Sequence, residues 1–423
     1  MPSSATASAD SLLHHRSFVA FWLARTGSSF GFQMLSIAVS WQIYSITGRA
    51  LDLGLIGLAQ FLPSVALALP AGHVADQFDR RRIVLFGQLA EWLAIAALAA
   101  LTLTHHVNEV VILGLIFLIS VAKAMEAPSL QSMLPALVPP ALLARAMAAN
   151  AASGEAAMMV GPALGGFLYV AGAGTVYAAA GALYLISIVM VSRLHYEHTP
   201  PRRVPASFAT LFAGVRFIRA RPDVLGVISL DLFAVLLGGA TALLPIFAKD
   251  ILHTGAWGLG LLRGAPAVGA LLVGFWLSRR SLERHVGMIM FIAVAGFGVA
   301  TLVFALSSVL WLSLLALFAL GAFDMVSMVI RGALVQLDTP DDMRGRVSAV
   351  NSIFINTSNQ LGEFESGLLA AWVGAVPAAA LGGIGTLLVV GLWMAWFPNL
   401  RRRQRLDNGS AEALNESGAV DTL

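Results

Sequence analysis

The chain has no cysteine among its 423 residues and little charge, since Asp, Glu, Lys and Arg together make up only 12%. The absence of cysteine excludes disulfide bridges and thiolate metal sites. Soluble domains carry about 25% charged residues, so the shortage of charge argues against a chain that folds in water. Hydrophobic residues instead make up 58%, and the mean hydropathy is +0.81. This composition predicts a protein of the lipid bilayer.

Several catalytic signatures are also missing. The chain contains no G-x-x-x-x-G-K-[ST] loop, so we do not expect ATP to be its energy source. The histidine pairs in LHHR (13–16) and THHV (104–107) lie at ends or in loops and lack a second metal-ligand pattern such as H-E-x-x-H. An intramembrane protease is therefore disfavoured, and we predict no enzyme activity, cofactor or metal. Despite the pI of 9.6, no nucleic-acid partner is expected for this composition.

Long apolar runs are what the chain has instead. About 20 apolar residues span the ~30 Å hydrocarbon core as a helix. A β-barrel would need short alternating segments, and the sequence has none. We predict an all-α membrane protein with twelve transmembrane helices, of which the fifth and eleventh are the most polar. The expected helices cover residues 18–46, 51–75, 83–104, 108–134, 142–170, 173–192, 223–247, 255–278, 285–307, 309–335, 346–373 and 376–397.

The placement of Lys and Arg predicts the orientation. If the chain starts inside the cell, twenty of the 26 Lys and Arg residues lie on the inner side, and only Arg49 and Lys249 lie outside. The other four lie within the apolar runs. Because cytoplasmic loops carry an excess of these residues, both termini are predicted to be cytoplasmic.

The sequence also repeats itself at an offset of about 200 residues. GLAQFLP (57–63) aligns with GLLRGAP (260–266), and GPALGG (161–166) aligns with GEFESG (362–367). Segments 72–84 and 144–150 align in the same order with 274–286 and 345–351. Two homologous six-helix halves imply alternating access at a site near the midplane. The expected parts are an N-terminal tail 1–17, a first half 18–192, a cytoplasmic linker 193–222, a second half 223–397 and a disordered tail 398–423.

One short loop, PAGHVADQFDRRRIVLFG (70–87), concentrates five charges between two apolar runs. It resembles the loop motif G-x-x-x-D-R-x-G-R-R of the major facilitator superfamily, which it matches at Gly72, Asp76, Arg80 and Arg81. Asp79 replaces a glycine of the motif, and this change resembles the branch that contains enterobactin exporters and related drug-efflux proteins. Segments 24–48 and 343–367 resemble that branch too.

The resemblance implies that the loop latches the inner gate. Asp76 would pair with arginine and face a helix N-terminus of the other half, an interaction worth about 0.3–1 kcal/mol. The alternative is that the arginines only fix the topology. The second half has Ser278 in place of Asp76, so only one complete latch is expected.

A second motif, VGPALGG (160–166), resembles the one found in proton-coupled antiporters of the superfamily. Its residues Gly161, Pro162, Gly165 and Gly166 would let helices approach closely and bend. Ordinary helix packing is the alternative, because small residues at four-residue spacing also serve that purpose. Together with the other matches, the motif favours export over import.

Charged residues within apolar runs are the candidates for binding cargo, because an ionisable group in a membrane helix is costly and usually functional. Arg25 matches a basic position of the exporter branch and is the first candidate for gripping an anionic or hydrogen-bonding substrate. It could equally pair with a carboxylate to join helices. Arg263 and Arg331 are the further candidates. Lys123 and Glu126 share a helix face and could neutralise each other. Asp324 and Arg331 lie about 10 Å apart along one face and therefore need other partners.

Carboxyl groups in the apolar runs are the candidates for carrying a proton, because a dry cavity favours the protonated form. Asp231 is the first choice, followed by Glu155 and Glu365. Glu91 and Glu363 complete the set. Glu363 and Glu365 are about 200° apart around a helix, so only one of them can face a given cavity.

These patterns predict a secondary active transporter of the cytoplasmic (inner) membrane. It would export a small organic molecule, a siderophore or a hydrophobic drug, by proton antiport, as a monomer whose other partners are protons and lipid. An importer or symporter of a small metabolite, and a transport-dead membrane sensor with the same fold, remain alternatives. A channel or scramblase fits the composition but not the two-half repeat with its gate loop.

Overall fold

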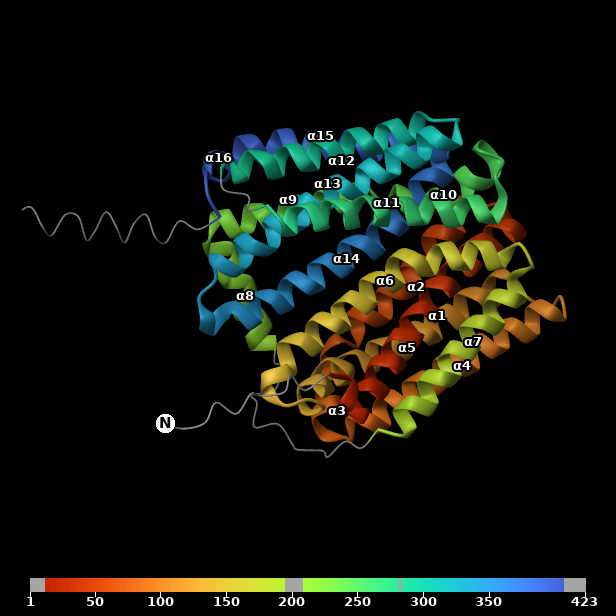
Figure 1. Ribbon diagram of the computed structural model, residues 1–423. Coiled ribbons are helices and arrows are strands. Elements are labelled where there is room, and N and C mark those ends of the chain that lie inside the picture. Colours follow the sequence, from red (N-terminus) through yellow and green to blue (C-terminus); the bar gives the residue numbers. More distant parts are fainter. Residues whose placement is uncertain (1–11, 195–207, 281–283, 407–423) are drawn as a thin grey trace, which may run out of the picture. The chain divides into compact units, whose positions relative to one another are not determined.

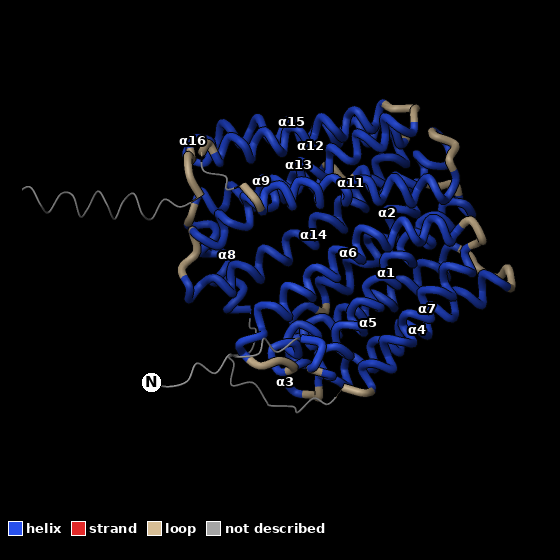
Figure 2. Tube along the Cα trace, viewed as in Figure 1, coloured by secondary structure: helices blue, strands red, loops and turns tan. Residues whose placement is uncertain are grey.

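The structure is a computed structural model that describes residues 12–194, 208–280 and 284–406. Parts of the expected tails and linker, namely residues 1–11, 195–207 and 407–423, lie outside the described residues. Figure 2 shows that the described chain is built from helices joined by short loops, and no strand occurs in it.

Helices follow the apolar runs of the first half of the sequence (Figure 1). Three single turns, Leu12–His14, Leu134–Ala136 and Pro140–Leu142, accompany the main helices. The main helices are α1 (Arg16–Thr47), α2 (Ala50–Ala66), α3 (Ala68–Gln77), α4 (Arg80–Leu103), α5 (Glu109–Met133), α6 (Leu143–Tyr169) and α7 (Ala173–Ser192).

The second half of the sequence is equally helical. Short turns at Ala240–Leu243 and Phe247–Ile251 flank the one-turn helix α10 (Leu244–Ile246). The other helices are α8 (Phe208–Ala220), α9 (Pro222–Leu237), α11 (Gly255–Ser278), α12 (Val286–Leu306), α13 (Leu310–Leu337), α14 (Asp341–Val373), α15 (Ala375–Trp396) and α16 (Pro398–Arg402).

The number of membrane spans differs from the expectation. Eight segments of the described chain are long and apolar enough to cross a membrane, or nine if the bent pair α2 and α3 counts as one span. The remaining long helices, α1, α6 and α14, carry more polar residues and do not reach the same apolarity. The apolar helices make the chain a multi-pass membrane protein, whereas the predicted count of twelve stays a prediction.

Two of the predicted spans are interrupted. The second run bends by 54° between α2, which contains Pro63, and α3. The seventh run leaves α-helical geometry after Leu237 and passes through α10, where Pro245 stands in the first turn. Proline removes a backbone donor and favours such breaks.

The helices cluster into two compact units. The N-terminal unit consists of the described residues of Met1–Gly48, Leu62–Ala206 and Ala256–Gly260. The C-terminal unit consists of those of Arg49–Phe61, Ser207–Gly255 and Leu261–Leu423. Within the N-terminal unit α1 packs on α6 and α7, and α4 packs on α5 and α7. Within the C-terminal unit α12 packs on α13 and α15, and α9 packs on α14 and α15.

Helices occupy parts of the expected linker and of the expected tail. Helix α8 occupies part of the linker and packs on α14, where a Cβ at Gly214 would lie 2.9 Å from Val350. The expected disordered tail begins instead as helix α16, whose Leu400 is fully buried. The first residues of the expected tail are therefore helical in the described chain, at Pro398–Arg402. The buried Leu400 explains why, because it adds the tail to the core of the C-terminal unit.

Candidate functional site

An ion pair is buried within the C-terminal unit. Asp231 on α9 and Arg331 on α13 form an ion pair through Oδ2 and Nη1, and both side chains are largely buried. A buried carboxylate needs such a partner, because its charge loses the solvation of water. Two candidates thus lie together: the first choice for proton coupling and a candidate for substrate binding neutralise each other.

A small cavity adjoins this pair. It has a volume of about 10 Å³ and is lined by Asp231, Asp324 and Ser327 together with Phe297 and Phe323. About one water fits a space of this size. Asp324 therefore lines the same cavity as Asp231 of the ion pair. It precedes Arg331 on the same helix, α13.

Arg263 and the two glutamates of α14 form a separate group in the C-terminal unit. Arg263 on α11 interacts electrostatically with Glu363. Its buried Nε has no hydrogen-bond partner among the described residues. Glu363 packs on α2, since a Cβ at Gly57 would lie 2.9 Å from its own Cβ. Glu365, two residues on, is partly buried beside Ser366, as expected for residues on different faces of one helix.

The N-terminal unit holds a further cluster of buried ionisable groups. Glu91 on α4 and Glu126 on α5 are buried. Lys123 and Arg25 are partly buried, and both interact electrostatically with Glu126. The Lys123 Nζ lies 3.8 Å from the centre of the Phe32 ring, a cation–π contact. The expected simple pair of Lys123 and Glu126 is therefore part of a group drawn from three helices.

Neutral polar side chains of the N-terminal unit also form buried hydrogen bonds between helices, and the sequence analysis did not identify them. The Ser187 hydroxyl lies 2.6 Å from the Ala24 carbonyl oxygen and 2.9 Å from Gln88 Oε1. Tyr177 donates to Gln42 Oε1 at 2.5 Å. The only sequence signal for them was the presence of polar residues within apolar runs.

The charged loop is held together locally. The Asp76 and Arg80 side chains are 3.7 Å apart, and Arg80 is buried and donates to the Ala75 carbonyl at 3.2 Å. Asp79 caps α4 by accepting a hydrogen bond from the Arg81 backbone N–H at 2.9 Å. Whether Asp76 acts as a gate latch stays a prediction. Gly72, the first residue of the motif, faces open space, since an added Cβ would meet nothing within 4 Å.

Arg81 has a role that the motif did not predict. Its Nε donates to the Val191 carbonyl at 3.1 Å, and its Nη2 donates to the Ser192 carbonyl. These carbonyls end α7, where a cation is favoured. The loop is thereby attached to α7 as well as to α4.

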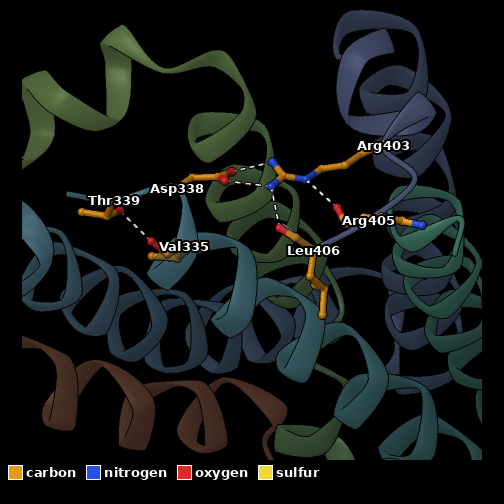
Figure 3. A network of polar contacts seen from close by, with 6 residues as sticks. All are labelled: Val335, Asp338, Thr339, Arg403, Arg405 and Leu406. Atoms are coloured by element: carbon orange, nitrogen blue, oxygen red, sulfur yellow. Dashed lines mark hydrogen bonds and ion pairs between the residues drawn. The ribbon is translucent and has the colours of Figure 1, made fainter. Parts of the chain in front are cut away.

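The C-terminal unit has its own polar connection at the end of α13, which the sequence analysis missed (Figure 3). Arg403 donates two hydrogen bonds to the Asp338 carboxylate, at 2.5 and 2.7 Å, and a third to the Leu406 carbonyl at 2.9 Å. Bidentate arginine–carboxylate contacts are among the stronger polar contacts in proteins. They hold the segment after α16 against the end of α13.

The glycines of the VGPALGG motif lie where helices touch. A Cβ at Gly161 would be 2.6 Å from the Gln33 Cβ, and one at Gly165 would be 2.9 Å from the Met34 carbonyl oxygen, both on α1. At Gly166 a Cβ would be 2.6 Å from the Cα of Gly260. Pro162 is buried within α6. Glu155, on the same helix, is exposed rather than enclosed in a dry cavity.

Apolar spanning helices with charged groups buried among them are typical of proteins that move ions or solutes across a membrane. The family comparison is more specific: residues 7–421 match the model of the transmembrane secretion effector family, which is of the major facilitator type. The chain belongs to this family, and its curated relatives are transporters and not enzymes.

Curated relatives share a quarter of the sequence. The enterobactin exporter EntS of Salmonella choleraesuis (strain SC-B67) is 25% identical over 393 residues, which are 92% of this chain and 94% of that protein. The enterobactin exporter EntS of Citrobacter koseri is also 25% identical and covers 92% of this chain and 93% of that protein.

Solved transporters share the fold. The nucleoside transporter NupG is 16% identical, with a TM-score of 0.65 over 90% of this chain and 99% of that chain. An inward-facing bacterial homologue of the human lysosomal transporter Spinster is 15% identical, with a TM-score of 0.67 over 92% and 97% of the two chains. The peptide-transporter-family protein PepTSo is 12% identical, with a TM-score of 0.70 over 91% and 98%.

Proposed function

We propose that this protein exports a small organic molecule from the cytoplasm across the cytoplasmic membrane by proton antiport with alternating access. The observation that carries the proposal is the match to enterobactin exporters over almost the whole length of both chains. The buried charges in both units add to it, because ionisable groups in membrane helices usually serve ion or substrate movement.

The proposed topology has twelve spans in two six-helix halves, 18–192 and 223–397, with both termini in the cytoplasm. Each of the twelve predicted runs coincides with a helix or a broken helix. The more polar α1, α6 and α14 fit this arrangement if they line the path of the cargo, where polar groups meet water instead of lipid. The excess of Lys and Arg on one side supports the orientation.

For cargo recognition we propose Arg263 and Arg25. The Nε of Arg263 is buried and has no hydrogen-bond partner in the described part of the chain, so a hydrogen-bonding group of the cargo would satisfy it. Arg25 is partly accessible on α1. Arg331 is better assigned to joining α9 and α13, since its guanidinium already pairs with Asp231. Cargo of this kind would be a siderophore or a hydrophobic drug with polar groups.

The three first candidates for the proton differ in their surroundings. Asp231 is paired with arginine, which favours its charged form. Glu155 is exposed and Glu365 is only partly buried. None of the three combines full burial with free carboxylate oxygens, so the proton is better sought elsewhere in the molecule.

Efflux from cells that overproduce the protein tests this function. We would load cells with a panel of catecholate siderophores and hydrophobic drugs and follow their release with and without an uncoupler. Arg263→Gln serves as the test variant, and Arg82→Gln, which changes an exposed arginine, serves as the matched control. Uncoupler-sensitive export that is reduced only in Arg263→Gln is expected.

Other outcomes would point to the alternatives. Accumulation of a compound instead of its release would contradict export and indicate an importer. A correctly inserted protein that moves no compound in either direction would contradict transport and favour a membrane sensor.

A further inference from the structure

The N-terminal unit contains polar atoms without partners at one place between α4, α5 and α7. Glu91 is fully buried on α4, and neither of its carboxylate oxygens has a hydrogen-bond partner of normal geometry within the described chain. The Tyr184 hydroxyl on α7 lies beside Glu91 and interacts with it, but the two groups make no hydrogen bond of normal geometry. Buried polar atoms are paired in the great majority of cases, so these atoms indicate that a further species binds here.

Glu126 on α5 belongs to the same place. Its Oε2 is buried without a hydrogen-bond partner in the residues that the structure describes. A Cβ at Gly87, one turn before Glu91 on α4, would lie 3.3 Å from this oxygen. The Glu126 carboxyl group therefore rests against the backbone of α4, and the charges of Glu91 and Glu126 interact.

Lys123 and Arg25 supply the opposing charge. Both interact electrostatically with Glu126, and Lys123 also with Glu91. Two carboxylates and two cations balance in number, but two neighbouring carboxylates repel each other. Such a repulsion is relieved when one of them takes up a proton, which also provides a donor between the two.

The other ionisable groups on the helices around α4 have different surroundings. Glu109 is in the first turn of α5. Three further side chains have partners of their own: His73 contacts Gln77, Asp76 contacts Arg80, and Tyr177 donates to Gln42.

We propose that Glu91 and Glu126 form a proton-binding site that holds one exchangeable proton, and that this site, rather than Asp231, couples transport to the proton gradient. The coupling role rests on the proposed function, whereas the binding of a proton does not. Tyr184 would position the proton by hydrogen bonding to Glu91. Lys123 and Arg25 would stabilise whichever carboxylate is ionised.

The charge balance of the site also predicts which cargo group is coupled to it. With both carboxylates ionised the four groups are neutral, and a proton makes them positive. A cationic or hydrogen-bond-donating group of the cargo near Arg25 and Lys123 therefore favours the deprotonated site, so cargo and proton exclude each other as antiport requires. An anionic group there would favour the protonated site and give symport.

Infrared difference spectroscopy on the purified full chain tests the proton site without any cargo. As the pH is stepped through the neutral range, the C=O band of a buried protonated carboxyl group is expected in the wild type. Glu91→Gln and Glu126→Gln should each remove it, and Glu126→Asp should retain a shifted band. Asp231→Asn and Glu155→Gln are the matched controls and should keep it. A band that survives in both glutamine variants, or is lost only in Asp231→Asn, would overturn the proposal.

Ethidium transport in everted membrane vesicles separates coupling from folding. In Glu91→Gln and Glu126→Gln, uptake driven by a pH gradient should fall to the level of vesicles without the protein, while gradient-independent exchange of ethidium persists. Gradient-driven uptake at the wild-type level in both variants would contradict the coupling role. If the wild type moves no ethidium while the infrared band behaves as stated, antiport of ethidium is contradicted and the proton site is supported.

Discussion

The buried charges of the two units are organised differently. In the C-terminal unit, Asp231 and Arg331 neutralise each other one to one. In the N-terminal unit, two carboxyl groups and two cations share one place, and several of their buried polar atoms lack hydrogen-bond partners among the described residues. A closed pair stabilises a helix contact, whereas an unsatisfied group can bind and release a proton. The comparison therefore favours a structural role for the Asp231–Arg331 pair and supports the proposed coupling role of the N-terminal group.

The difference is notable because the sequence repeats between the units. Asp324 stands in the C-terminal unit at the offset of about 200 residues from Lys123, so an acidic residue replaces a basic one at corresponding positions. The close glycine contacts, in contrast, recur. A Cβ at Gly166 would lie 2.6 Å from the Gly260 Cα, and one at Gly367 would lie 2.5 Å from the Gly54 Cα. Helix packing repeats while the buried charges diverge.

Breaking the closed pair should have the largest effect. Arg331→Ala leaves Asp231 buried without its partner, and removing one member of a buried pair costs about 3–5 kcal/mol. We expect a strongly reduced yield and a lower melting temperature of the purified protein in detergent. The double variant Asp231→Asn/Arg331→Gln should recover much of the loss because neither member of the pair is then charged. Equal stability of the single and double variants would contradict a structural pair.

Filling the glycine contacts should have the next largest effect, and a similar one in both units. Gly166→Ala and Gly367→Ala each force backbones apart, and overpacking costs about 1–3 kcal/mol. Thermal unfolding in detergent measures the change. Gly72→Ala is the control, since its Cβ meets nothing within 4 Å. A loss of stability in Gly72→Ala as large as in Gly166→Ala and Gly367→Ala would show that close packing is not the cause.

The cap of α4 should contribute less. Asp79→Ala removes the side chain that accepts from the Arg81 N–H, and losing such a cap costs about 1 kcal/mol. The corresponding helix α12 begins at His285 without a side-chain cap, so the effect has no counterpart there. Arg82→Gln is the control: its arginine is exposed 3.8 Å from Asp79 and should contribute little. Equal melting temperatures of Asp79→Ala and Arg82→Gln would contradict a stabilising role of the cap.

Neutralising the unsatisfied carboxyl group should have the smallest effect on stability. Glu91→Gln keeps the shape of a side chain whose oxygens have no hydrogen-bond partner in the described structure. We expect a change within about 1 kcal/mol, because no formed hydrogen bond is lost. Asp231→Asn, measured by the same melting assay, should be clearly less stable than Glu91→Gln. If Glu91→Gln were the less stable variant, the structural role given to Asp231 and the absence of such a role for Glu91 would both be contradicted.

Much of the fold could be predicted from the sequence, because apolar runs and turn residues are local signals. The helical segments were predicted in this way, and the transporter family was predicted from the resemblance of the loop motif. Both are confirmed, whereas the count of twelve spans stays a prediction. Pairings across long sequence separations could not be predicted. Asp231 and Arg331 lie on different helices, and nothing local marks them as partners. Asp338 and Arg403 were missed because an arginine in a basic tail resembles a topology signal.

The candidate site was predictable only as a set of residue types. Polarity within apolar runs identified Glu91, Glu126 and Asp231 alike. What separates them is whether a neighbouring helix supplies a partner, and this depends on packing. Tyr184 and Gln88 were overlooked because a tyrosine or glutamine in an apolar run is not by itself evidence of function.

The most direct test of the account is the direction of proton movement in proteoliposomes that hold the purified protein and an internal pH dye. An imposed ethidium gradient should drive protons in the opposite direction to the cargo in the wild type and in Glu155→Gln, and drive none in Glu126→Gln. Protons that move with the cargo, or that still move against it in Glu126→Gln, would contradict the claim that this carboxyl site couples export to the proton gradient.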